Sequence, residues 1–382
     1  MVKSVNVKLI RWSRVKKASP NFAYYLPRWL CIYLGVSLLL ACTPVQQPPQ
    51  QQLTVNSEQN TTVAQAAPQS SVPAQHTVAM LNSWQAGASK QAIEHFVQQS
   101  IQLGGKHYLP VAERVAVFDL DGSLWVERPQ KAMMAFIHKE LIKQLQRQPS
   151  LKSKQPWKSV ARGDEGYLQR LNYSTLYLML LKAHEGQTQT AYDYYVQNFF
   201  KQASHPEYKK NYLALAYQPM QELIRYLQAH QYQVYLVDSS DTQFMRALSQ
   251  TLFNIPVENV IGSSAMLMWR ASSGELIRGN EFVAPINNDE GKPVNIERHI
   301  GRRPVIAVGN DDNDIAMLNY VASGKNKSLL MLVKHDDAAR EYRYNKGAEQ
   351  IQALAAEKKW LVISIKNDFK QIFLAAAAVY DD

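Results

Sequence analysis

The segment Val115-Ala116-Val117-Phe118-Asp119-Leu120-Asp121-Gly122-Ser123 decides the fold of this 382-residue chain, because it runs from an apolar strand directly into two acids. Four apolar residues in a row, two of them β-branched, are typical of a strand covered on both faces. Side chains two positions apart in extended chain share a face, so Asp119 and Asp121 should converge, and Gly122 permits a sharp turn. Ligands of open α/β sheets bind beyond the carboxyl ends of strands, where two acids suit a hard cation such as Mg²⁺.

A calcium-binding EF-hand loop is the first alternative for the D-x-D-G string. That loop needs Gly at its sixth position and Glu at its twelfth. Counted from Asp119, those positions hold Leu124 and Gln130. The sequence therefore argues against an EF-hand and leaves a plain surface turn as the alternative to a catalytic site.

The N-terminal segment has the pattern of an export signal. The first 41 residues carry seven Lys or Arg and no acid, and they end in a short apolar run, 29–41. That run is short for a membrane span, so we expect a cleaved secretory signal. Its end, Leu39-Leu40-Ala41-Cys42, resembles the lipobox of bacterial lipoproteins, in which Cys42 would carry the lipids. The alternative is an uncleaved amphipathic anchor with Cys42 incidental.

Cleavage at this point changes what the charge and the cysteines imply. The formal charge would fall from +10 to +3 as the seven cations leave, so the basic pI gives no support for nucleic-acid binding. Cys31 would leave with the signal, and Cys42 would be acylated. The mature protein should therefore have neither a disulfide nor a cysteine metal site.

A Gln-, Pro-, Ser- and Thr-rich stretch, 42–80, follows the predicted lipidation site. Such a composition cannot bury enough apolar surface to offset its ordering entropy, so a disordered tether is expected. As a flexible chain it would reach on the order of 30 Å. The roughly 300 residues that remain suffice for one core with an inserted subdomain.

The rest of the chain alternates helical and strand patterns, which predicts a parallel sheet with helices on both faces. The region 127–217 is rich in Tyr and Leu and lacks β-alternation, so it is predicted to be a helical insertion. Its first helix is expected to begin at Pro129. A helix opened by Pro219 follows it. The later strands are predicted at 232–237, 305–308, 329–333 and 361–365.

A basic run lies at the start of the predicted insertion. Nine Lys or Arg occur from Arg128 to Arg162, with Glu140 as the single acid. A solvated helix face is the usual meaning of such a run. An electropositive lid that attracts phosphate esters is the functional alternative.

Four polar clusters at strand ends resemble the four ordered motifs of the haloacid dehalogenase superfamily. They are Asp119-Leu120-Asp121-Gly122-Ser123, Asp238-Ser239-Ser240-Asp241, Lys292 within Glu290-Gly291-Lys292-Pro293, and Gly309-Asn310-Asp311-Asp312-Asn313-Asp314. Within the superfamily the likeness is to exported members of the phosphoserine-phosphatase-like branch, over roughly residues 81–373. It implies an α/β, Rossmann-like three-layer core with a parallel sheet, built from 81–126 and 218–375, and a helical cap inserted at 127–217.

The resemblance also implies a role for each motif. Asp119 would be the nucleophile that forms a phosphoaspartyl intermediate, and Asp121 the general acid and base. The second acid is present in phosphatases of the superfamily and absent from its dehalogenases. The implied phosphate-binding residues are Asp238, Ser239 and Lys292, and the implied Mg²⁺ ligands are Asp119, Asp121, Asn310 and Asp314.

Three residues depart from the motifs of the superfamily. Ser123 stands where Thr is commoner and keeps the hydroxyl. Asn310 replaces an acid and would bind a cation more weakly, with Asp311 or Asp314 able to compensate. Asp238 stands where a phosphate-binding Ser or Thr is expected and would repel a phosphate dianion, unless the loop shifts by one residue and Ser239 supplies the hydroxyl.

These observations lead to one function and two alternatives. The sequence predicts a Mg²⁺-dependent phosphomonoester hydrolase, lipid-anchored in the bacterial cell envelope at the outer membrane facing the periplasm. A degenerate binding or scaffold lipoprotein, motivated by Asp238, and a phosphotransferase are the alternatives. The expected partners are a small phosphorylated substrate and a membrane reached through the anchor, with no nucleic acid and no obligate protein partner.

Overall fold

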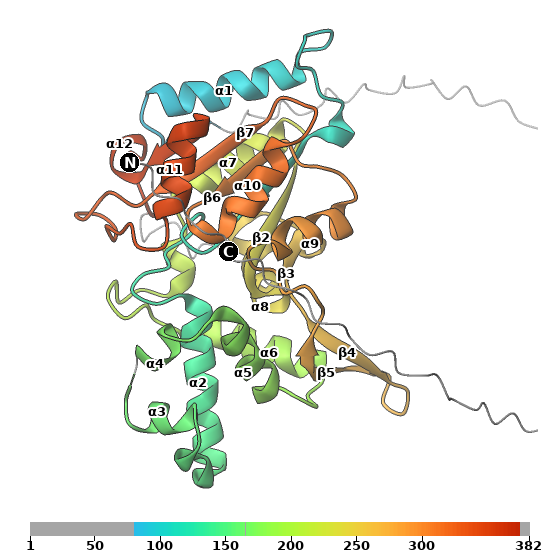
Figure 1. The fold of residues 1–382 in the computed structure, drawn as a ribbon, viewed down its shortest axis with the longest axis vertical. Helices are drawn as coiled ribbons and strands as arrows, with labels where there is room; N and C mark the ends of the chain where they lie inside the picture. Colours follow the sequence, from blue (N-terminus) through green and yellow to red (C-terminus); the bar gives the residue numbers. More distant parts are fainter. Residues whose placement is uncertain (1–79, 165, 375–382) are drawn as a thin grey trace, which may run out of the picture. The chain divides into compact units, whose positions relative to one another are not determined.

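A six-stranded parallel sheet forms the centre of the protein. The computed structural model describes residues 80–164 and 166–374, which lie within one compact unit. The strand order is β3-β2-β1-β6-β7-β8, with every neighbouring pair parallel (Figure 1). The strands are β1 (Val115–Phe118), β2 (Gln233–Asp241), β3 (Val260–Ser263), β6 (Ile306–Gly309), β7 (Leu329–Lys334) and β8 (Leu361–Ser364).

Helices cover both faces of this sheet, as the sequence pattern predicts. Alternating side chains of β1 pack into two separate apolar clusters on opposite faces of the sheet, with Phe118 in one and Val117 in the other. The Phe118 cluster contains α1 (Ala88–Ile101), α7 (Gln218–Ala229) and α8 (Thr242–Phe253). The Val117 cluster contains α9 (Gly291–Ile300), α10 (Ile315–Ala322) and α11 (Glu349–Lys358). The result is the predicted three-layer α/β core.

The strand order brings three of the four motifs to neighbouring strand ends. β1 lies between β2 and β6, and Phe118 is in register with Leu236 on one side and Val308 on the other. The carboxyl ends of parallel strands lie at one edge of the sheet. The acids after β1, β2 and β6 therefore meet there, although they are far apart in the sequence.

The chain between β1 and β2 is helical, as predicted for the insertion 127–217. Its α-helices are α2 (Ala132–Arg147), α3 (Trp157–Ala161), α4 (Gly166–Gln169), α5 (Tyr173–Ala183) and α6 (Gln189–Gln202). The first helix begins at Ala132 instead of Pro129. Aromatic residues of α2 and α6, among them Phe136 and Phe199, join the same apolar cluster as the core helices.

Several elements were not predicted. Strand β2 continues to Asp241 instead of ending at Val237, so the second motif is extended chain and not a loop. Helix α1, edge strand β3 and an antiparallel hairpin, β4 (Ala265–Arg270) and β5 (Glu275–Phe282), were missed. The alternation that marks a half-buried strand is absent from β4, because four consecutive residues, Met266 to Trp269, are all exposed.

The predicted signal, Cys42 and tether lie outside the described residues. Within the part of the chain that the structure describes, every helix is too short or too polar to cross a membrane.

Candidate active site

The first motif forms a tight turn directly after β1. Gly122 has φ +84°, and its N–H donates to the carbonyl of Trp125 at 2.9 Å. A Cβ at this glycine would lie 2.1 Å from Nδ2 of Asn310, so only glycine fits. The turn brings Ser123 back toward the strand end. There its hydroxyl can donate to either of two acceptors, Asp119 Oδ2 at 3.2 Å or Asn310 Oδ1 at 3.1 Å.

Asp121 presents one satisfied and one unsatisfied carboxylate oxygen. Oδ1 accepts a hydrogen bond from Nε1 of the buried Trp125 at 2.7 Å. Oδ2 is buried and has no hydrogen-bond partner among the described residues, with the Lys131 ammonium 3.8 Å away. Burial, followed by the charge of Asp238, raises the pKa of Asp121 to about 7. An oxygen of this kind is suited to hold a proton near neutral pH.

Lys292 joins the first and fourth motifs. It lies in the first turn of α9 and is 2% exposed, with its Nζ 2.7 Å from Asp119 Oδ1 and 2.6 Å from Asp314 Oδ1. Burial alone would lower the pKa of this ammonium, but Asp119 and Asp314 outweigh burial and hold the pKa well above its usual range. The geometry that the sequence predicted for Lys292 is therefore present.

The fourth motif uses its last acid internally. Asp314 Oδ2 accepts hydrogen bonds from the main-chain N–H of Asn310 at 2.9 Å and of Asp311 at 3.3 Å, while Oδ1 accepts from Lys292. Asp314 thereby orients Lys292 and the loop. Asn310, which is also predicted as a metal ligand, has its Oδ1 3.1 Å from Ser123 Oγ, and its Nδ2 donates to Glu127 at 3.2 Å.

Asp238 lies inside the site and not in a displaced loop. It is 1% exposed, its Oδ1 accepts from the N–H of Ser240 at 2.6 Å, and its Oδ2 accepts from the N–H of Asp121 at 3.3 Å. Burial raises the pKa of Asp238, but attraction to Lys131 and Lys292 outweighs burial and lowers the pKa to about 2. The carboxylate is thus ionised, and it accepts hydrogen bonds from two main-chain N–H groups, those of Asp121 and Ser240.

Ser239, whose hydroxyl is predicted to bind phosphate, is held in place through its main-chain carbonyl. Its main-chain carbonyl accepts hydrogen bonds from the hydroxyl of Tyr173, in α5, and from Ser263 Oγ at 2.7 Å. No hydrogen bond to the Ser239 hydroxyl is found among residues 80–164 and 166–374. Tyr173 thereby connects the helical insertion with the second motif.

Carboxyl groups outnumber ammonium groups at the site, and this excess favours the binding of a cation. Six carboxyl groups interact there with two ammonium groups; they are Asp119, Asp121, Glu127, Asp238, Asp311 and Asp314, against Lys131 and Lys292. Burial and repulsion from Asp314 hold the pKa of Asp119 well above its usual range. Burial, together with Asp314, also raises the pKa of Asp311 to about 7. An added divalent cation would relieve this repulsion.

The donors fit Mg²⁺ only as a mixed set. Among the described residues no three His, Cys, Asp or Glu side chains are arranged to hold a metal ion. Asp119 Oδ2 and Asn310 Oδ1 do converge, since both lie within hydrogen-bond distance of Ser123 Oγ. Carboxylate, amide and carbonyl oxygens are the ligands that Mg²⁺ prefers, so Asp119 and Asn310 fit the ion, and Asp121 and Asp314 stay predicted ligands.

Three further residues take part in the site and were not predicted for it. Lys131 lies 3.1 Å from Glu127 Oε2, and Glu127 in turn accepts from Asn310 and from Tyr344. The basic run from Arg128 contained the signal for Lys131, but nothing in the sequence distinguished it from the other eight cations. Glu127 and Tyr173 carried no distinguishing signal, because the contacts of Glu127 with Asn310 and of Tyr173 with Ser239 join residues 183 and 66 positions apart in the sequence.

Comparison with known proteins finds similar structures but no similar sequences. No protein-family model and no curated protein matches this chain. A protein of unknown function from Bordetella pertussis Tohama I is 13% identical with a TM-score of 0.44, covering 66% of this chain and 98% of its own. One from Anaerococcus prevotii is 14% identical with a TM-score of 0.47, covering 72% and 91%. A phosphoserine phosphohydrolase-like protein from Francisella tularensis is 13% identical with a TM-score of 0.37, covering 65% and 94%.

Similarities at this level bear neither on activity nor on substrate. The fold is defined by the strands and motifs of the chain itself. The first, second and fourth motifs follow three adjacent parallel strands, the lysine of the third bridges two of them, and a helical insertion follows the first strand. The chain accordingly has a Rossmann-like α/β fold with a helical insertion after its first strand, and the four motifs that resemble those of the haloacid dehalogenase superfamily lie at neighbouring strand ends of its sheet or bridge them.

Proposed function

We propose that this protein is a Mg²⁺-dependent phosphomonoester hydrolase that works through a phosphoaspartyl intermediate. The observation that carries the proposal is the Lys292 ammonium, which lies 2.7 Å from Asp119 and 2.6 Å from Asp314. Phosphoryl transfer depends almost wholly on positioning and on offsetting the charge of the phosphoryl oxygens. A buried, charged lysine next to a carboxylate nucleophile supports that chemistry.

The residues divide the reaction into two steps. An oxygen of Asp119 attacks phosphorus, the P–O ester bond breaks, and the leaving oxygen takes the proton from Asp121. Water then attacks the phosphoaspartyl group, Asp121 accepts its proton, and inorganic phosphate and free Asp119 result. Trp125, by holding Oδ1 of Asp121, leaves Oδ2 as the oxygen that carries the proton. Held by Asp119, Asp121 and Asn310, Mg²⁺ would offset charge on the phosphoryl oxygens.

Hydrolysis of an aryl phosphate by the purified protein tests this proposal. Turnover is expected with Mg²⁺ and should fall by about 10³-fold or more in Asp119→Asn, which removes the nucleophile while keeping its size. Asp314→Asn is the matched comparison, because it should reduce activity through Lys292 without abolishing the nucleophile. Absence of turnover with any divalent cation would refute the hydrolase.

A binding or scaffold protein with this fold is the second candidate. It is favoured by the Asp238 carboxylate, which holds the N–H groups of Asp121 and Ser240 that a phosphoryl oxygen could otherwise use. If the wild type is inert and Asp238→Ser creates turnover, this candidate is right. If Asp238→Ser lowers a turnover already present, Asp238 is part of the mechanism.

The place of action is also proposed. The export signal at 1–41 and the lipobox cysteine support lipid anchoring at Cys42, on the outer membrane facing the periplasm. Labelled palmitate should be incorporated by the wild type and not by Cys42→Ser. Equal labelling of both proteins would contradict the anchor.

A further inference from the structure

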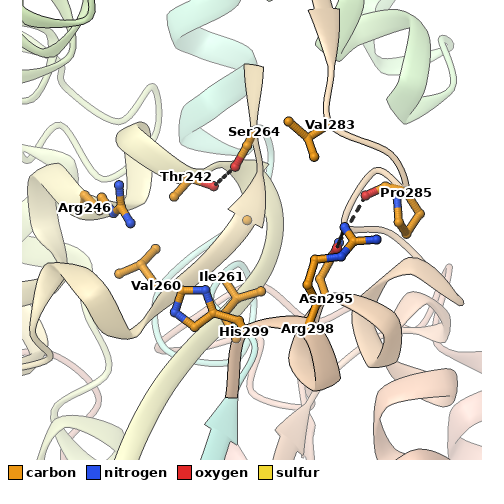
Figure 2. A pocket seen from close by; sticks show the side chains of 11 residues that line it. Thr242, Arg246, Val260, Ile261, Ser264, Val283, Pro285, Asn295, Arg298 and His299 are labelled. Carbon is orange, nitrogen blue, oxygen red and sulfur yellow. Dashed lines mark hydrogen bonds between the residues drawn. The ribbon is translucent and has the colours of Figure 1, made fainter. Parts of the chain in front are cut away.

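A second pocket lies on the sheet edge beside the second motif. It has a volume of about 230 Å³ and is formed by α8, β3, the base of the β4–β5 hairpin and α9 (Figure 2). Its lining is Thr242, Arg246, Val260, Ile261, Gly262, Ser264, Val283, Pro285, Asn295, Arg298 and His299. None of the residues placed in the active site above is among them.

The pocket is cationic and has no internal counter-ion. Arg246 lies on one side and Arg298 on the other, with His299 between them in the view of Figure 2. The lining contains no Asp or Glu, and none of the ion pairs among the described residues involves these three side chains. Two guanidinium groups that line one pocket create a positive potential that favours the binding of an anion there.

Main-chain carbonyls hold both guanidinium groups in place. Arg246 Nε donates to the carbonyl of Val257 at 2.8 Å, and Arg298 Nη1 donates to the carbonyl of Ala284 at 3.0 Å. Within the described part of the chain, Nη2 of neither arginine has a hydrogen-bond partner. Oriented guanidinium groups with free N–H donors match the oxygens of phosphate and carboxylate groups.

The rest of the lining suits a small ligand that has both polar and apolar parts. The hydroxyls of Thr242 and Ser264 lie 2.8 Å apart and can each donate or accept. Val260, Ile261 and Val283 supply apolar wall. A phosphate group, alone or on a small organic molecule, would fill this space.

Hydrogen bonds connect the pocket with the second motif. Arg298 Nη1 donates to Asn295 Oδ1, Asn295 Nδ2 donates to Asn287 Oδ1, and each distance is 3.1 Å. Asn287 Nδ2 then donates to the carbonyl of Asp238 at 2.7 Å. A ligand that moves Arg298 therefore acts on the main chain of Asp238 through two asparagine side chains.

We propose that this pocket is an effector site for a small oxyanion of the phosphate class and that its occupancy is transmitted to Asp238. The proposal does not depend on the hydrolase activity. It assigns Arg246 and Arg298 as the ligands of the anion and Asn295 and Asn287 as the connection.

Titration of the full-length protein with inorganic phosphate tests the binding. EDTA is present throughout, because without a divalent cation the acid-rich active site repels phosphate. The double substitution Arg246→Gln and Arg298→Gln should weaken binding roughly 10-fold or more, since it removes charge-assisted hydrogen bonds. Arg225→Gln, an exposed arginine on α7 outside the pocket, should bind like the wild type. Thr242→Val gives a second, milder loss if the double variant does not fold.

Amide hydrogen exchange of the segment 237–242 tests the transmission. Phosphate should slow exchange there in the wild type and leave it unchanged in Asn295→Ala, which retains both arginines. Phosphate affinity that is equal in the wild type and the double variant would refute the site. Binding without any change at 237–242 in the wild type would refute the transmission.

Discussion

At the scale of single residues, the aspartates of the site differ in how many of their carboxylate oxygens accept a hydrogen bond, and from which donors. Asp314 has a donor on each oxygen, Asp121 on one, and Asp238 takes main-chain N–H groups from Asp121 and Ser240. The same residue type therefore has three different hydrogen-bond environments within one site. The turn at Gly122 determines this arrangement, because it sets where Asp121 and Ser123 point.

Replacing Gly122 by alanine should disable the site. The new Cβ would clash with the Asn310 side chain at 2.1 Å and would sit at φ +84°, so Asn310 and the turn must both move. Displacement of reacting groups by about 1 Å can cost about 100-fold in rate, and we expect a loss of that order in kcat. Gly163→Ala is the matched control, because Gly163 has φ +70° and open space around it. Equal activity of the two variants would show that the turn does not position the site.

At the scale of elements, the β4–β5 hairpin fastens the helical insertion to the core. Arg278 on β5 is 2% exposed, contacts Asp241 Oδ2 at 3.0 Å and Gln189 Oε1 at 3.1 Å, and stacks over the Tyr192 ring. Asp241 in turn accepts from Tyr177 of α5 and caps the start of α8. This junction joins the hairpin to the insertion and to the start of α8.

Substituting Arg278 by methionine should destabilise the protein. Removal of the guanidinium group leaves the buried Asp241 carboxylate without its counter-charge, which costs about 3–5 kcal/mol. Urea unfolding measures this free energy directly. Arg270→Met on the exposed strand β4 should change it by about 0.5 kcal/mol or less, as surface substitutions usually do. An unfolding free energy in Arg278→Met that is as high as in Arg270→Met would contradict a fastening role.

At the scale of the whole molecule, the acid cluster links stability to pH and to cations. Asp121 and Asp311 have a reference pKa of 3.8, and in the folded protein each pKa is raised to about 7. The folded state therefore binds more protons than the unfolded state between these values. Stability from these groups is complete below pH 4 and is lost as the pH rises through 7. Asp238 has the opposite sign, because its pKa is lowered to about 2, so its contribution is lost only in strong acid.

Thermal unfolding in EDTA should accordingly show a lower melting temperature at pH 8 than at pH 5. The expected difference in unfolding free energy is on the order of a few kcal/mol, because the acids repel one another once ionised. Mg²⁺ should raise the melting temperature at pH 8 more than at pH 5, since it binds the ionised cluster. Asp121→Asn should reduce the pH dependence. A melting temperature in EDTA that is independent of pH would show that the cluster is not strained by its charge.

The sequence by itself determined the first strand, its acidic turn, the helical character of the insertion and the order of the four motifs. These features follow from local periodicity and from residues adjacent in the chain, which a sequence displays directly. Only the tertiary structure decided that Asp238 binds main-chain N–H groups, that Asp314 is used by Lys292, and that Glu127, Lys131 and Tyr173 join the site. Hydrogen bonds across tens to hundreds of residues depend on how strands and insertion pack, and packing leaves no mark at either residue alone.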